Sequence, residues 1–273
     1  MKVYIMTDME GCAGILDHDN WVTPQGRYYE AGRRILTEEV NAAIEGFLEG
    51  GATQIVVCDG HGFGGIDPLQ LHEKAELIRG VASPPYPFWL DRSYDAIAHV
   101  GQHAKAGTPF SHITHTGWFS AIDCTVNGIS VGEYGEMCLC AMELGVPSIF
   151  ASGEEAFCRE AEALTPGVVT VAVKRGLLPD GLEHLTTDQY KSAKLAACHL
   201  HHHEACRRIR LGAAAAARKW HLQPESFSYP QIHRPYVRIN RVRGDGTSPP
   251  YTVRADHPDS LIALMNSPGT RLE

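Results

Sequence analysis

The chain lacks long apolar runs. None of its 273 residues falls in a stretch close to the ~20 apolar residues that a membrane-spanning helix needs. The N-terminus, MKVYIMTD, has one lysine and a few apolar residues before an acidic group, unlike a secretory signal peptide. These two absences predict a cytoplasmic protein with no membrane partner.

The chain is also short of positive charge and of paired cysteines. Its 24 Lys and Arg against 32 Asp and Glu give a net charge of −8, which disfavours nucleic acid as a partner. None of the eight cysteines forms a C-x-x-C pair, so a zinc ion held by four thiolates is not supported. Scattered cysteines in a cytoplasmic chain are typical of buried small hydrophobic residues. At 44% hydrophobic residues, the chain can build a core and is not disordered.

Apolar runs and amphipathic stretches alternate along most of the sequence. This alternation predicts an α/β layered fold with a largely parallel central sheet flanked by helices. The expected strands are residues 2–8, 54–58, 96–100, 147–151 and 168–173. The expected helices are residues 28–49, 132–145, 154–164 and a long one over about 188–219.

Two further features describe the second half of the chain. Asn127-Gly128 separates two short apolar runs and predicts a hairpin, because both positions accept positive φ. The proline-containing stretch 222–236 reads as a linker. We therefore expect a main metal-binding catalytic domain over 1–220, and a small C-terminal α+β element over 221–273 with a hairpin and a short helix.

Acidic and imidazole groups follow three of the expected strands. Asp8 and Glu10 lie at the end of the first strand, and their i, i+2 spacing puts both carboxylates on one face of an extended chain. His61 and His103 come just after the next two strands. Ligands of open α/β sheets bind outside the carboxyl ends of the strands, so these side chains are candidates for one metal site.

Glu133, at the start of a later expected helix, is a further candidate. Taken alone, it is better explained as an acid that favours the helix dipole. With the other four it makes three carboxylates and two imidazoles, a donor set that suits Zn²⁺, Mn²⁺ or Co²⁺. One catalytic zinc usually takes three protein ligands, so five ligands fit two metals that share Asp8 as a bridge.

A dinuclear site of this kind activates water for attack on an amide carbonyl. A neighbouring acid or base must then manage the proton of the leaving amine. The polar loop 108–117 offers His115 and His112 for this role or for substrate binding, although both could be surface histidines.

Several short motifs resemble those of the zinc-dependent D-aminopeptidases of the DppA type, peptidase family M55. The first is the D-x-E-G signature Asp8-Met9-Glu10-Gly11 near the N-terminus. The others follow in the family's order: Asp59-Gly60-His61, Gly101-Gln102-His103-Ala104, Thr114-His115-Thr116 and Val131-Gly132-Glu133-Tyr134-Gly135. The resemblance is good over about residues 1–175 and diffuse afterwards.

The resemblance implies a function as well as a site. It implies two Zn²⁺ per subunit, bound by Asp8, Glu10, His61, His103 and Glu133 with Asp8 bridging. It assigns His115 a catalytic role, as a nucleophile or, by simpler chemistry, as an acid and base for attacking water. It also implies release of N-terminal D-amino acids such as D-Ala from short peptides, by a homo-oligomer that is a decamer in the family.

Two other functions remain open at this point. The same five ligands could serve another dinuclear metal amidase or hydrolase, or the chain could bind small peptides without cleaving them.

The tract His199 to His203 could also bind metal. A solvated face of the expected helix 188–219 explains it better, because His199 and His203 are its single i, i+4 pair.

Overall fold

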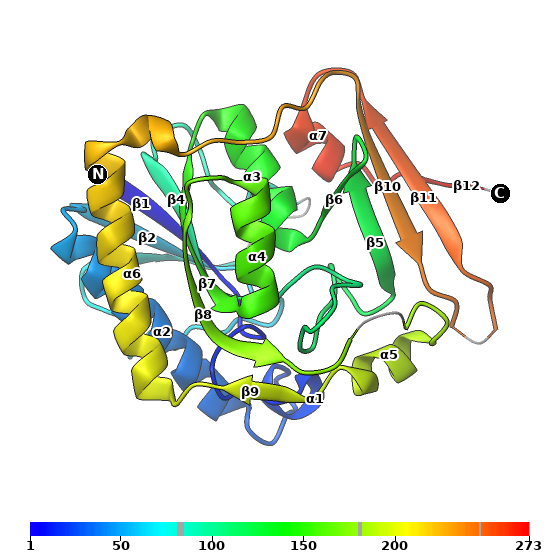
Figure 1. Ribbon diagram of the computed structural model, residues 1–273, viewed down its shortest axis with the longest axis horizontal. Helices are drawn as coiled ribbons and strands as arrows, with labels where there is room; N and C mark the ends of the chain where they lie inside the picture. The colour runs from blue at the N-terminus through cyan, green and yellow to red at the C-terminus, as the bar shows by residue number, and fades with distance from the viewer. Residues whose placement is uncertain (81–84, 180–181, 246, 273) are drawn as a thin grey trace.

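A computed structural model describes residues 1–80, 85–179, 182–245 and 247–272. The chain forms a seven-stranded sheet, with strand order β3-β2-β1-β4-β7-β8-β9, and a five-stranded sheet, with strand order β12-β11-β10-β5-β6 (Figure 1). Helices cover the larger sheet, as predicted from the alternation of elements. Within the described residues, no helix has the length and apolar character needed to cross a membrane.

The larger sheet is parallel except at one edge. Its strands from β3 to β8 pair in parallel, and β9 runs antiparallel to β8. The central strands are buried on both faces, which explains why they read as continuous apolar runs. The strands are β1 (Lys2–Thr7), β2 (Gln54–Asp59), β3 (Ala75–Ile78), β4 (Ala96–Gln102), β7 (Ser148–Glu154), β8 (Val169–Gly176) and β9 (Ala197–His199).

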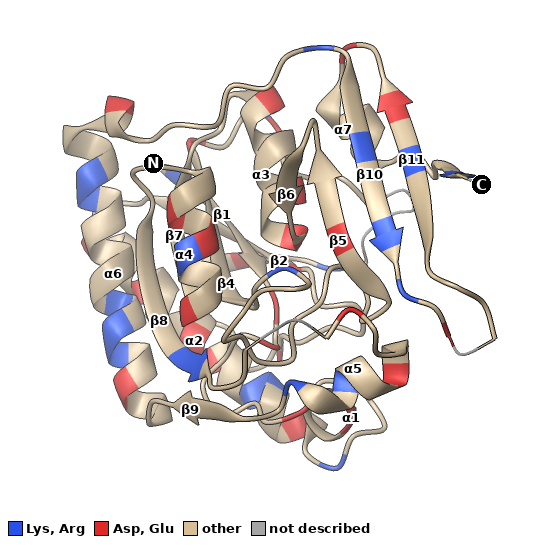
Figure 2. Cartoon of the chain, turned by 45° about the vertical axis from the view of Figure 1, so that its right-hand side comes forward, with Lys and Arg blue, Asp and Glu red and all other residues tan. Residues whose placement is uncertain are grey.

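Helices pack on both faces of this sheet. α2 (Tyr29–Glu49) and α6 (His202–Leu222) lie together, and a Cβ at Gly46 of α2 would come within 2.2 Å of the Arg210 carbonyl oxygen. α3 (Glu133–Leu144) and α4 (Glu155–Leu164) share one core cluster, and α3 also contributes to a second cluster with residues of β1, β2 and β4 (Figure 1). Charged residues lie along α4 and α6 (Figure 2), as expected for amphipathic helices that cover a sheet.

The smaller sheet joins the middle of the chain to its end. The predicted hairpin is β5 (Ala121–Val126) and β6 (Ile129–Val131), with φ of 48° at Asn127 and 81° at Gly128. β10 (Tyr236–Val242) pairs antiparallel with β5. The rest of this layer is β11 (Tyr251–His257), α7 (Leu261–Met265) and β12 (Thr270–Leu272). The C-terminal strands thus extend a hairpin of the preceding part, and the division at residue 220 stays a prediction.

The long helix expected over 188–219 is wrong. The chain forms α5 (Thr187–Ala193), then β9, and only then α6. Tertiary hydrogen bonds override local propensity there, because Leu177 N–H donates to the Ala196 carbonyl at 2.9 Å and Leu200 N–H to the Val173 carbonyl at 2.9 Å. His199 therefore lies on a strand, and the expected i, i+4 pair with His203 does not exist.

Besides β9, four short elements have no counterpart in the sequence predictions. They are the four-residue helix α1 (His18–Trp21), β3 at the edge of the larger sheet, the 3₁₀ helix η1 (Pro224–Ser226), and β12. The first of them borders the site described next, because the carbonyl of Val22, the C-cap of α1, contacts His61.

Candidate metal centre

The sheet brings the sequence candidates to one edge. β2, β1 and β4 are adjacent and parallel, so the residues that follow them emerge side by side. Close backbone approach fixes the two central loops: Gly11 N–H donates to the Gly101 carbonyl at 2.7 Å. A Cβ at Gly11 would lie 2.1 Å from the Gln102 carbonyl oxygen, and Gly101 has a φ of +78°. Both positions therefore require glycine.

Asp8, Glu10 and His61 form a first set of converging ligand atoms, here named the Asp8 group. His61 Nδ1 lies 3.2 Å from Asp8 Oδ1 and 3.2 Å from Glu10 Oε2. All three residues are buried, with exposed fractions of 7%, 3% and 8% in the order named. Asp8 is held in place by the Met9 N–H, which donates to its Oδ1 at 2.9 Å.

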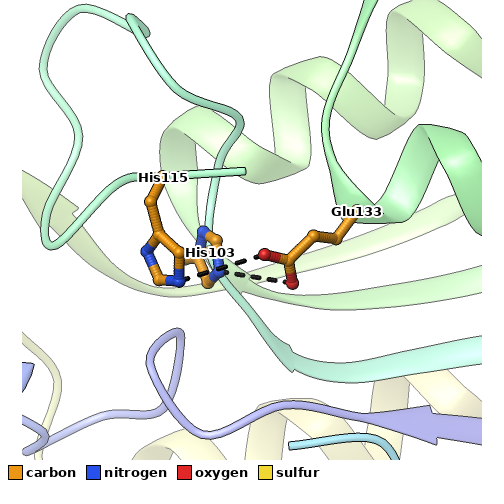
Figure 3. A group of neighbouring side chains, drawn as sticks. All are labelled: His103, His115 and Glu133. Atoms are coloured by element: carbon orange, nitrogen blue, oxygen red, sulfur yellow. Dashed lines mark ion pairs between the residues drawn. The ribbon is translucent and has the colours of Figure 1, made fainter. Parts of the chain in front are cut away.

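His103, His115 and Glu133 form a second set, the Glu133 group (Figure 3). Glu133 Oε2 lies 3.6 Å from His103 Nε2, and its Oε1 lies 3.9 Å from His115 Nε2. The two imidazole rings stack with centroids 4.0 Å apart. Glu133 is the first residue of α3, and the Gly117 N–H donates to its Oε1 at 2.8 Å.

Asp8 links the two groups. Its Oδ1 faces His61, and its Oδ2 lies 3.2 Å from His103 Nε2. Gln102, which the sequence predictions did not include, donates from Nε2 to Asp8 Oδ2 at 3.0 Å and to Glu133 Oε2 at 3.4 Å. One carboxylate thus contacts an imidazole of each group, as a bridging ligand would.

Backbone carbonyls orient all three imidazoles. His61 Nε2 lies 2.7 Å from the Val22 carbonyl, His103 Nδ1 2.9 Å from that of Ala104, and His115 Nδ1 2.8 Å from that of Ile113. A carbonyl only accepts, so each of these nitrogens carries a proton. In the neutral ring, the other nitrogen then presents a lone pair toward the carboxylates, which is the arrangement of metal-ligating histidine.

Two buried atoms at the centre of the cluster have no hydrogen-bond partner. They are Glu10 Oε2, which lies 3.2 Å from His61 Nδ1, and His103 Nε2, which lies 3.2 Å from Asp8 Oδ2, and neither of these ion-pair contacts is a hydrogen bond. Buried polar atoms without a partner are rare in native proteins and need an explanation. Cations held between the lone pairs and the carboxylates would satisfy both atoms, so the residues present fit bound divalent metals.

Burial and neighbouring charged groups shift the pKa values of the cluster in the metal-free protein. Burial, together with the neighbouring Glu10 carboxylate, raises the pKa of Asp8 to about 7. Burial disfavours the charged forms of His61 and His103, but the surrounding carboxylates raise the pKa of both rings well above the usual value. For His115, burial and the nearby His103 lower the pKa to about 4.

A cavity of about 390 Å³ opens beside the cluster. Its acidic lining consists of Asp8, Glu10, Glu133 and Glu136. Two aromatic side chains also line it and are partly open to solvent: Phe63 is 53% exposed and Trp118 is 44% exposed. Its apolar lining includes Met6, Pro85, Phe88 and Met137. A larger cavity of about 800 Å³ runs along α4 but contains none of the ligand atoms. The smaller cavity is therefore the one placed for substrate.

His112 does not belong to this cavity. Its ring is fully buried, its Nε2 lies 3.1 Å from the Leu16 carbonyl, and it packs edge-on against His199 at 5.4 Å. Burial, together with the charge of Lys174, lowers the pKa of His112 to about 2. The sequence suggestion that His112 binds substrate finds no support in this placement.

Two buried charged residues that the sequence predictions missed support the ligand loops. Glu154, at the end of β7, accepts the Ala104 N–H at 2.8 Å and the His112 N–H at 2.7 Å. It thereby fixes the loops that carry His103 and His115. Lys174, opposite Glu154 on β8, donates to the Glu10 carbonyl. Nothing in the local sequence separates these two residues from ordinary surface charges.

A parallel α/β sheet with buried carboxylates and imidazoles at its carboxyl edge defines the class of a hydrolytic metalloenzyme. The comparisons make the class specific: residues 1–241 match the D-aminopeptidase family, peptidase M55, and the chain belongs to it. This confirms the resemblance found in the motifs, and the family is one of peptide-bond hydrolases, the predicted class of enzyme.

Two relatives illustrate the similarity. A D-aminopeptidase of Bacillus subtilis (strain 168) is 36% identical over 177 residues, which is 64% of each chain, so the match spans just under two thirds of that relative. The structure of the Zn-dependent D-aminopeptidase DppA from Bacillus subtilis, described as a self-compartmentalizing protease, is similar with a TM-score of 0.82 and 27% identity. That match covers 97% of this chain and 95% of DppA, and it confirms the predicted fold class.

Proposed function

We propose that this chain is a zinc-dependent aminopeptidase that releases the N-terminal residue, a D-amino acid such as D-Ala, from short peptides. The observation that carries the proposal is the orientation of three imidazoles. Each has one nitrogen committed to a backbone carbonyl and the other turned toward buried carboxylates. The Zn-dependence and the name of the related DppA support zinc and the D-residue preference.

The five proposed ligands would divide between two zinc ions. Asp8, Glu10 and His61 would hold one, and Asp8, His103 and Glu133 the other, with Asp8 shared. When bound, such a pair supplies an acidified water and polarises the substrate carbonyl. Mn²⁺ or Co²⁺ would suit the same nitrogen and oxygen donors.

His115 manages the proton in this proposal. Because its pKa is lowered to about 4, the ring is neutral near neutral pH, and its Nε2 can accept a proton. The Ile113 carbonyl fixes the opposite nitrogen, and stacking on His103 and Phe119 holds the ring plane. His115 would take a proton at Nε2 and deliver it to the leaving amine. Direct attack by His115 on the carbonyl is the competing role.

The wider setting is part of the proposal. DppA is described as self-compartmentalizing, which supports a homo-oligomer for this chain. The size that we propose is the decamer implied by the motif resemblance. We also propose a cytoplasmic location.

The test combines elemental analysis with a stereochemical assay. We expect about two zinc ions per chain, and hydrolysis of D-Ala-D-Ala but not of L-Ala-L-Ala. Activity should disappear on chelation and return with zinc. Hydrolysis of other amides alone would favour a different dinuclear hydrolase. Peptide binding without turnover in the zinc-loaded protein would favour a binding protein.

A further inference from the structure

One acidic side chain of the active-site cavity has no place in the ligand cluster. Of the four acids that line this cavity, Asp8, Glu10 and Glu133 belong to the two groups and Glu136 does not. Glu136 follows Glu133 by three residues on α3. Residues at this spacing share a helix face, with Cβ atoms about 5–6 Å apart. Glu136 therefore lies one helical turn away from the ligands, along the cavity wall.

The hydrogen bonds of Glu136 leave part of its carboxylate unused. The Tyr86 hydroxyl donates to Oε2 at 2.6 Å, and the Cys124 thiol approaches Oε1 at 3.6 Å. Both donors are neutral, and a carboxylate has about four lone-pair sites. Among the described residues, no Lys, Arg or His forms an ion pair with Glu136. The nearby Arg238 guanidinium donates to the Met265 and Ser267 carbonyls instead, at 2.8 and 2.6 Å.

We propose that Glu136, assisted by Tyr86, binds the free α-ammonium group of the substrate. The inference rests on the proposed aminopeptidase function. An ammonium group is the cation that this carboxylate lacks, and a charge-assisted hydrogen bond to it is among the stronger interactions in proteins. The Tyr86 oxygen, having donated its proton to Glu136, keeps lone pairs that accept a second ammonium proton.

The spacing of the two glutamates suits a terminal residue. The α-nitrogen and the carbonyl carbon of one residue are about 2.5 Å apart, given the N–Cα and Cα–C bond lengths. An ammonium on Glu136 therefore keeps the scissile carbonyl beside the Glu133 group. Met6, Phe88 and Met137 line the same cavity and provide apolar contact for the side chain. An internal residue has an amide nitrogen at this point and leaves Glu136 unpaired, so the enzyme acts on chain ends.

The test compares substrates with and without the amine. The substrates are D-Ala-p-nitroanilide and its desamino analogue propionyl-p-nitroanilide, assayed with wild type and Glu136→Gln. We expect Glu136→Gln to lower kcat/KM for the amine substrate by roughly 10- to 100-fold, the range of a hydrogen bond to a charged group. Turnover of the desamino analogue and the zinc content should not change. Tyr86→Phe should give a smaller loss in the same direction.

Glu143→Gln is the matched control on the same helix. Glu143 caps α7, where its carboxylate accepts the Ile262 N–H at 3.1 Å and the Ser260 hydroxyl at 2.9 Å, and it does not line the cavity. The Glu143→Gln variant should leave the ratio of activities on the amine and desamino substrates unchanged, even if its melting temperature falls. Equal losses on both substrates for Glu136→Gln would show a structural role and overturn the inference.

A binding measurement separates this inference from the proposed function. Calorimetry with D-alaninol, an amine without a scissile bond, and with N-acetyl-D-alaninol needs no turnover. Wild type should bind the amine more tightly, and Glu136→Gln should lose that difference. If wild type binds D-alaninol more tightly, Glu136→Gln loses this difference, and wild type hydrolyses neither anilide, the result supports amine recognition and rejects the peptidase proposal. Identical binding by wild type and variant overturns amine recognition alone.

Discussion

The Asp8 group and the Glu133 group differ in how the fold holds them. Asp8, Glu10 and His61 follow two adjacent central strands, and their side chains are exposed by 10%, 4% and 5%. The Glu133 group takes its members from a strand end, a loop and the start of a helix, and the Glu133 side chain is 29% exposed. The first group thus lies directly after two neighbouring strands, whereas the second depends on segments farther apart that other residues must position.

This difference has consequences for metal binding. The ligands of the Asp8 group lie one to three residues past the ends of β1 and β2, so we expect it to hold metal more tightly. Both groups line the cavity, but the Glu133 group contains His115, the proposed proton carrier, so we expect it to lie nearer to the reacting atoms. The comparison therefore predicts that one of the two proposed metals would anchor the site and the other would act beside the substrate.

The largest effect should come from Asp8→Asn, which removes the link between the groups. The amide cannot bridge two cations, so both metals should be lost. Activity should fall by at least on the order of a thousandfold, because the metals supply several kcal/mol of transition-state stabilisation. Elemental analysis and kcat measure both losses. Retention of two zinc ions would show that Asp8 is not shared.

Glu10→Gln and Glu133→Gln directly test the expected difference in metal affinity between the two groups. Each substitution preserves shape and removes one charged ligand. Glu133→Gln should retain about one zinc ion, in the Asp8 group, whereas Glu10→Gln should weaken the tighter site. Titration with a chelator measures the two affinities. Equal retention in the two variants would contradict the comparison.

His115→Gln should affect the chemistry more than the metal. Both zinc ions should remain, because His115 is not one of the proposed five ligands, while kcat should fall by roughly 10²- to 10⁴-fold, the range of general acid–base catalysis. Steady-state kinetics on D-Ala-p-nitroanilide together with elemental analysis measures this. A variant with both metals and near-normal kcat would rule out either role for His115.

Glu154→Gln tests the support of the Glu133 group. The amide can accept only one of the two N–H groups that Glu154 now accepts, from Ala104 and His112. Metal binding at the Glu133 group should weaken by roughly 10- to 100-fold, as for other residues that position metal ligands. Glu155→Gln is the matched control, because Glu155 follows Glu154 in the chain and its side chain is 43% exposed. Equal metal affinity in both variants would remove Glu154 from this role.

The smallest expected effect is the dependence of zinc affinity on pH. The raised pKa values of His61 and His103 mean that the metal-free protein holds protons there near neutral pH. Zinc must displace these protons, so its affinity should rise from about pH 6 to about pH 8. Calorimetry in two buffers of different ionisation enthalpy measures the protons released. Zinc binding without proton release would show that the rings are already neutral.

The sequence was most informative where a motif coincided with a strand end. Asp8, Glu10, His61 and His103 could be grouped because each follows an apolar run, and the structure does place them at one edge. Glu133 entered the set mainly through the family resemblance, since an acid at a helix start is common. His112 and His115 looked equivalent, because they lie three residues apart in one loop. Only the fold turns His115 toward the cluster and buries His112 away from it.

The sequence could not reveal the residues that act through distant contacts. Glu154 and Lys174 lie fifty residues or more from the backbone groups they bind at Ala104 and Glu10. The helix expected over 188–219 failed for the same reason, since hydrogen bonds to β8 draw residues 197–199 into the sheet. Local patterns carry no record of such partners.

By itself, the sequence determined the alternation of strands and helices, the chemistry of the ligands and the family, because these depend on residue type and short spacing. The tertiary structure decided which imidazole nitrogen faces the carboxylates, which buried charges support the loops, and which acid of the cavity lies outside the two groups. Those features depend on contacts between segments far apart in the chain, and only the packed sheet brings these segments within hydrogen-bonding distance.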